Sequence, residues 1–226
     1  MPAADNLPLL KAIIADPEDD TARLAYADWL EENGQGERAE FVRVQVEFAR
    51  HPHRADILAA NYDARDGIDE DWARGFALQL REEALWNFGA PGRWAIDSEL
   101  PFDHCIRCID QETISKSTTT RTPIAVFRRG FVAQITCALA DWRAHGPALA
   151  RAHPVETVRL TDGMHPREYG AGDDRWAVYR DLIGVDLFDL MCPGNRGEGY
   201  AESSDHGLLE SALSAALLAW AKSQPA

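Results

Sequence analysis

The feature that most constrains this fold is the helical periodicity of the first fifty residues, which is interrupted twice by residues that end helices. Leu10 and Ile13 lie on one apolar stripe of a helix that we expect over residues 7–15. Asp16 ends this helix because it precedes a proline, and a residue in that position is pushed out of the helical region. The opening segment is therefore predicted to be a set of short helices.

Two further helices are expected in the same segment. Asp19 or Asp20 can accept hydrogen bonds from the first free N–H groups of the second helix, and Gly34 provides the left-handed residue that commonly follows a helix. The third helix is expected to begin near Glu37 and to bury Phe41. A unit of this size has too small a core to be stable alone, so its apolar face should dock on the rest of the chain.

Residues 9–50 also carry a more specific pattern, with acidic caps around a Tyr-Ala-Asp-Trp-Leu centre. The residues of this pattern are Leu9, Leu10, Ile13, Asp16, Pro17, Asp19, Asp20, Arg23, Leu24, Tyr26, Ala27, Asp28, Trp29, Leu30, Glu31, Gly34, Glu40, Phe41, Arg43 and Gln45. With these residues the segment resembles the short repeat-companion domain of planctomycetes and some myxobacteria, which commonly precedes leucine-rich or other repeats. The resemblance implies a bacterial lineage and a neighbouring repeat segment, but no reaction and no ligand.

The C-terminal third contains a repeated apolar frame. VAQITC at 132–137 and VETVRL at 155–160 place apolar residues at the first, fourth and sixth positions, and VDLFDL at 185–190 is a weaker copy that could equally be a buried helical turn. The spacing is close to the roughly 20–29 residues of leucine-rich repeats, although the asparagine that normally closes such a frame is absent. These frames predict a short, degenerate, leucine-rich-repeat-like segment.

The segments around these frames complete the predicted fold. Residues 140–152 can form a helix between the first two strands, and a strand–helix–strand order gives a parallel pair. Residues 208–222 form an amphipathic helix that could cap the exposed sheet edge. We predict the α/β class: a helical N-terminal module (1–50) packed on a small leucine-rich-repeat-like parallel sheet with a C-terminal capping helix (127–226), joined by a helical or irregular connecting region (51–126).

The charge of the chain limits its possible partners. Asp and Glu number 37 against 23 Lys and Arg, which gives a net charge of −14. Nucleic acids and anionic membranes favour basic surfaces, so neither is an expected partner, and Arg128-Arg129 is only a local exception. No apolar run approaches the roughly 20 residues of a membrane span, and the N-terminus lacks the basic region of a secretory signal. We expect a cytoplasmic protein.

The sharpest chemical motif is a Cys-x-x-Cys pair at Cys105 and Cys108, which could grip one tetrahedral zinc ion from a tight turn. A closed site needs further ligands, and Cys192, His206 or His104 could supply them, although none belongs to a second paired motif. Alternatively, the segment is a strand whose cysteines act as small apolar residues. We therefore predict that the chain has no cofactor. The alternative is a zinc-binding protein in which the metal is structural or hydrolytic.

Other chemistry-bearing residues favour structural roles. Asp28 has no neighbouring nucleophile, and we expect it to fix an adjacent helix through Arg38 or Arg43. Cys137 fills an apolar strand position and should be buried, while His153 at a helix end should complement the helix dipole. No zinc-protease, phosphate-loop or nucleophile-elbow motif occurs, so an enzyme is not predicted.

These observations favour a non-catalytic protein-interaction or adaptor module with an unidentified protein partner. Short repeat sheets expose alternate side chains on one open face, where a partner can bind. The chain could also be a subunit of a larger bacterial assembly. The side chains expected on the open face are Ala133, Thr136, Glu156, Thr157 and Arg159.

Overall fold

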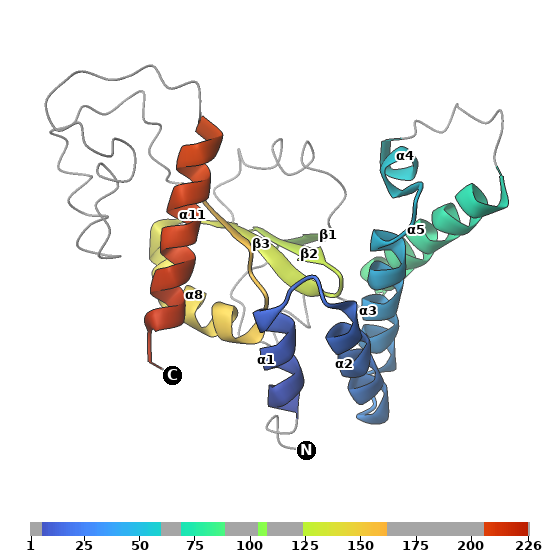
Figure 1. The fold of residues 1–226 in the computed structure, drawn as a ribbon, viewed down its shortest axis with the longest axis horizontal. Helices are drawn as coiled ribbons and strands as arrows, with labels where there is room; N and C mark the ends of the chain where they lie inside the picture. Colours follow the sequence, from blue (N-terminus) through green and yellow to red (C-terminus); the bar gives the residue numbers. More distant parts are fainter. Residues whose placement is uncertain (1–5, 60–68, 89–103, 108–123, 162–205, 226) are drawn as a thin grey trace, which may run out of the picture.

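The computed structural model describes residues 6–59, 69–88, 104–107, 124–161 and 206–225, which form helices around a small sheet (Figure 1). Its helices are α1 (Leu7–Ala15), α2 (Asp20–Glu32), α3 (Gly36–Ala49), α4 (Arg54–Ala59), α5 (Glu70–Phe88), α8 (Leu139–Ala152) and α11 (His206–Ser223). Its strands are β1 (His104–Arg107), β2 (Ile124–Arg128), β3 (Phe131–Cys137) and β4 (Thr157–Leu160). The predicted α/β class is confirmed.

The four described strands pair in the order β1-β2-β3-β4, with parallel pairing at both ends and antiparallel pairing of β2 with β3. The predicted parallel pair is β3 and β4, in which Ile135 lies opposite Val158, and α8 forms the predicted crossover between them. The expectation of a parallel sheet throughout is wrong, because β2 and β3 form a hairpin. The predicted boundary between residues 126 and 127 consequently falls inside β2.

The hairpin turn consists of two residues, Arg129 with a φ of 51° and Gly130 with a φ of +84°. Positive φ at both central residues gives a turn whose twist matches that of the flanking strands, which is why such two-residue turns join antiparallel strands. Gly130 also packs against α3, where an added Cβ would lie 2.9 Å from the Cα of Val42. The turn is therefore pressed against the helical module.

The helical module forms as the sequence predicts. Asp19 caps α2 by accepting a hydrogen bond from the Thr21 N–H at 2.8 Å, and Gly34 follows the helix with a φ of +78°. Asp28 makes the expected ion pair with α3, at 2.7 Å from Arg43. Local capping and helix-ending residues thus account for the three opening helices.

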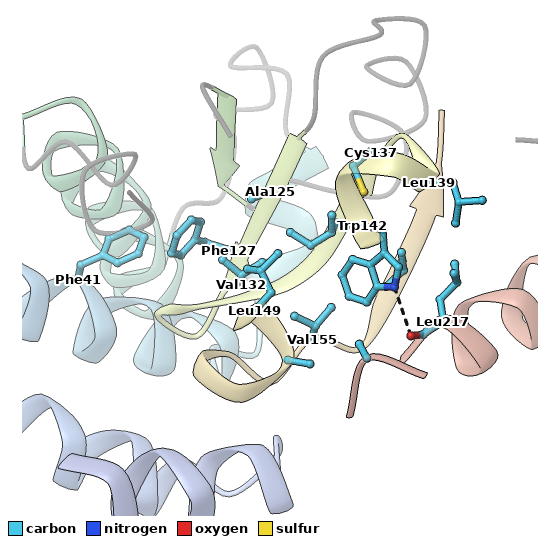
Figure 2. Close-up of a cluster of buried hydrophobic side chains, with 14 of the residues drawn as sticks. Phe41, Ala125, Phe127, Val132, Cys137, Leu139, Trp142, Leu149, Val155 and Leu217 are labelled. Atoms are coloured by element: carbon cyan, nitrogen blue, oxygen red, sulfur yellow. Dashed lines mark hydrogen bonds between the residues drawn. The ribbon is translucent and has the colours of Figure 1, made fainter. Parts of the chain in front are cut away.

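Two apolar cores hold the elements together. The smaller core lies within α1–α3 and is completed by one strand residue, Phe131, whose ring centroid is 5.3 Å from that of Tyr26. The larger core joins the sheet to α8 and α11 on one side and to α3 and α5 on the other (Figures 1 and 2). In Figure 2, Phe41 faces Phe127, and the indole Nε1 of Trp142 donates to the Leu217 carbonyl at 3.2 Å.

Helix α11 packs along β4, as the predicted capping helix should. The N–H of Val158 donates to the Ser214 hydroxyl at 2.8 Å, so a helix side chain satisfies a backbone group that would otherwise remain unpaired. The third apolar frame, residues 185–190, lies outside the described residues. In the parts of the chain that are described, every helix is too short or too polar to cross a membrane.

Candidate binding site at the hairpin turn

The residues expected on an open sheet face do not form one surface. Ala133 is 7% exposed and Thr136 is 2% exposed, so these two residues were wrongly placed at a partner-binding surface. The physical reason is that β3 is a central strand whose two faces are both covered. Glu156, Thr157 and Arg159 lie on or beside the edge strand β4 and remain at least partly exposed.

The proposed zinc ligands are only partly described. Cys105 lies in β1, which extends to Arg107. This agrees with the alternative prediction that the segment is a strand. Cys108 and Cys192 lie outside the described residues, and His206 begins α11. Among the described residues, no group of three or more His, Cys, Asp or Glu side chains could hold a metal ion. Cys137 is fully buried, as expected.

The described structure instead gathers arginines around the hairpin turn. They come from α2, the end of α3, α4, the end of β2 and the turn itself. Ion pairs link three of them, Arg50, Arg128 and Arg129, to acids on neighbouring elements. We call this group the arginine cluster; its members are Arg23, Arg50, Arg54, Arg128 and Arg129.

Arg128 ties three segments together at the surface. Its Nη2 lies 2.9 Å from a carboxylate oxygen of Glu18, which precedes α2, and its Nη1 lies 2.9 Å from Glu156, which precedes β4. The adjacent Arg129 lies 2.8 Å from the second oxygen of Glu18 and 3.7 Å from Asp20. Asp20 is itself paired with Arg50. Opposite charges therefore fix the geometry of this surface.

Arg23 is the buried member of the cluster. Its guanidinium donates to the Pro17 carbonyl at 2.7 Å and to the Arg129 carbonyl at 2.9 Å, and it lies over the Phe131 ring. Burial lowers the pKa of Arg23 to about 10, and the neighbouring charge of Arg129 contributes in the same direction. Arg23 remains a cation at neutral pH, because a pKa of about 10 is far above 7.

A cavity of about 80 Å³ lies beside the turn. Arginine side chains and two polar residues from α3 and α5 make up most of its lining. The lining residues are Gln45, Phe48, Ala49, Arg54, Glu82, Arg128 and Arg129.

Two buried polar side chains of the lining are joined to the turn. Gln45 is 5% exposed and Glu82 is 4% exposed. The amide of Gln45 donates to Glu82 at 2.7 Å, and its oxygen accepts from the Gly130 N–H at 2.6 Å. This chain of hydrogen bonds connects α5, α3 and the hairpin.

His153 does not complement the dipole of α8 as a cation, contrary to expectation. It is buried, its Nδ1 accepts from the Val132 N–H at 3.4 Å, and its Nε2 has no hydrogen-bond partner among the described residues. Burial, with a smaller contribution from the positive charge of Arg38, lowers the pKa of His153 to about 3. The imidazole is therefore neutral at pH 7.

Two features of the sequence could have indicated this site. Gln45 interrupts an otherwise apolar stripe of α3, between Phe41 and Phe48, which indicates a polar side chain in a buried position. The Arg129-Gly130 pair separates two alternating apolar runs, which is a hairpin signal. Arg23 was part of the family pattern, but neither that pattern nor any other sequence signal indicated that Arg23 or Glu82 would be buried beside the turn.

Comparison with known proteins gives no relative for this arrangement. No family model matches the chain, and no match is found among curated proteins or among solved structures.

Proposed function

We propose that this chain is a non-catalytic protein-interaction or adaptor module, able to act as a subunit of a larger assembly. Its contact surface would be a group of charged and polar residues around β4. We call this surface the β4 patch and define it as Glu18, Arg128, Glu156, Thr157 and Arg159.

The observation that carries the proposal is the double ion pair of Arg128. Both of its terminal nitrogens are held at 2.9 Å, by Glu18 and Glu156, while its side chain remains 39% exposed. A charged group that is already fixed loses little conformational freedom when a partner binds. Fixed charges of both signs also select a partner by the arrangement of its charges.

The test compares capture of partners by the wild type and by the double variant Glu156→Ala/Arg159→Ala. Both positions lie at the surface, so the free energy of unfolding should change by no more than about 1 kcal/mol. We expect recovery of bound partners to fall at least about tenfold, which corresponds to about 1.4 kcal/mol of binding free energy.

The matched control is Glu47→Ala/Arg74→Ala, which removes an exposed ion pair between α3 and α5, outside the β4 patch. This control should retain the same partners as the wild type. Undiminished capture of every partner by the β4 patch variant, in protein whose urea midpoint is unchanged, would overturn the proposal.

A further inference from the structure

Asn33 and Gly34 form the only Asn-Gly pair in the sequence, and they lie at the C-terminal end of α2. In such a pair the backbone nitrogen of the glycine can attack the side-chain amide of the asparagine, because the glycine has no side chain to block the approach. The residues that follow the other four asparagines are all large: Leu7, Tyr62, Phe88 and Arg196. The sequence therefore concentrates this reactivity at one position.

The surroundings of Gly34 leave room for the reaction. Gly34 is exposed, and a Cβ built on it would meet no atom within 4 Å. Its φ of +78° is a conformation that glycine adopts without strain. Crowding on this side of the chain therefore does not prevent the formation of a five-membered ring between the two residues.

The closed end of α2 opposes the attack. The Gly34 N–H donates to the Glu31 carbonyl at 3.0 Å, and the Nδ2 of Asn33 donates to the Trp29 carbonyl at 2.8 Å. The ψ of 17° at Asn33 also turns the Gly34 nitrogen away from the Asn33 side chain, whereas ring closure needs these groups eclipsed. The reaction therefore requires the helix end to open, which exposed helix ends do more readily than the core.

We propose that Asn33 is a site of spontaneous deamidation whose rate is set by local opening at the end of α2. In the open state the Gly34 nitrogen bonds to the Cγ of Asn33, and its proton passes through water to Nδ2. The Cγ–Nδ2 bond breaks and Nδ2 leaves as ammonia. Water then opens the cyclic imide: hydrolysis at Cγ gives aspartate, and hydrolysis at the main-chain carbonyl gives isoaspartate. The only co-reactant is water.

The modification changes the connection between α2 and α3. The product carboxylate lacks the Nδ2 donor that binds the Trp29 carbonyl, and it stands at the helix end where the helix dipole disfavours negative charge. Isoaspartate also lengthens the main chain, because the chain then continues through Cβ and Cγ. Each conversion should therefore make α2 open more easily. This chemistry does not depend on the β4 patch, so it and the adaptor function can fail separately.

The experiment incubates purified protein at neutral pH and body temperature, digests it, and quantifies aspartate and isoaspartate at Asn33 by liquid chromatography and mass spectrometry. The peptide that contains Asn6 is the internal control and should stay unmodified, because Leu7 follows it. We expect folded protein to react at least about tenfold more slowly than the same chain in concentrated urea, where no helix end blocks the attack. Asn33→Gln should remove the product, since its longer side chain cannot close the same five-membered ring.

Two variants test the dependence on local opening. Leu30→Ala removes a fully buried side chain from the last turn of α2 and should raise the rate in folded protein at least about threefold. Ser214→Ala loosens the contact between α11 and β4, away from α2, and should leave the rate within about twofold of the wild type. Urea denaturation establishes that both variants are folded under the conditions of incubation.

Any of three results would show that the proposal is wrong. Folded wild type without product at Asn33 would mean that the end of α2 stays closed to this reaction. Equal rates in folded and urea-unfolded protein would mean that the helix end does not control it. A rate in folded Leu30→Ala that is no higher than in Ser214→Ala would mean that local opening of α2 is not the limiting step.

Discussion

The side-chain oxygen of Gln45 accepts a hydrogen bond from the backbone N–H of Gly130 at 2.6 Å, while the amide of the same side chain donates to Glu82 at 2.7 Å. One buried residue of α3 thus holds both the hairpin turn and α5. Because these contacts are shielded from water, no solvent molecule can readily replace either one.

Replacing Gln45 with Leu should therefore destabilise the fold strongly. The change keeps the approximate volume but leaves the Gly130 N–H and Glu82 without this partner, which should lower the free energy of unfolding by about 2–5 kcal/mol. Urea denaturation measures the effect. The exposed Glu47→Gln on the same helix should cost less than about 1 kcal/mol, and equal effects of the two variants would contradict the role of Gln45.

Gly130→Ala should destabilise the protein more than Gly34→Ala. Both glycines have positive φ, so each alanine costs about 1–2 kcal/mol in backbone strain. At Gly34 the added methyl group meets nothing within 4 Å, whereas at Gly130 it would lie 2.9 Å from the Cα of Val42. Overpacking should add about 1–3 kcal/mol to the first variant only. Thermal unfolding of both proteins checks the difference, and identical losses would mean that the turn can move away from α3.

Ser214→Ala should uncouple α11 from the sheet edge. It removes the acceptor of the buried Val158 N–H, which should cost about 1–3 kcal/mol. Ser223→Ala, at the exposed end of the same helix, should cost much less. Hydrogen exchange at the Val158 amide provides the direct measurement, and unchanged protection of this amide would argue against the contact.

His153 should make stability depend on pH in the acid range. Its pKa is about 3 in the folded protein against 6.5 unfolded, so between these values the unfolded chain binds a proton that the folded chain does not. The folded state therefore loses stability as the pH falls from 6.5 towards 3, by up to about 1.4 kcal/mol per pH unit. In His153→Asn this contribution should disappear. Denaturation curves at several pH values test this, and parallel pH profiles for the two proteins would refute it.

Zinc content separates the adaptor proposal from the zinc alternative. We expect purified wild type and Cys108→Ser to contain no stoichiometric zinc by mass spectrometry and to unfold alike. One zinc per chain in the wild type, absent from the variant, would instead support a zinc-binding protein with Cys105 and Cys108 as ligands.

Much of the helical framework could be predicted because its signals are local. The proline after Asp16, the cap at Asp19 and the left-handed Gly34 mark helix ends without reference to the rest of the chain. The apolar frame that includes Ile135 likewise predicted β3, because the spacing of apolar residues can be read from a single sequence. The existence and type of these elements follow from short-range patterns.

The errors concern what covers each element. Alternation along β3 assigns Ala133 and Thr136 to sheet positions but does not reveal that both faces of this strand are buried. Arg23 is a polar helix residue, and its burial depends on a turn 106 positions later in the chain. Such long-range packing leaves little trace in local sequence, so the candidate site was largely missed.

The insertion of Phe131 into the core of α1–α3 has a consequence for how the protein is made. The opening helices leave the ribosome long before Phe131, the strand residue that completes their core. Until Phe131 is available, part of their apolar surface is exposed to solvent. Contacts between segments this far apart slow folding, and uncovered surface invites association with other chains. We therefore expect the nascent N-terminal helices to be a segment that chaperones can bind before Phe131 is synthesised.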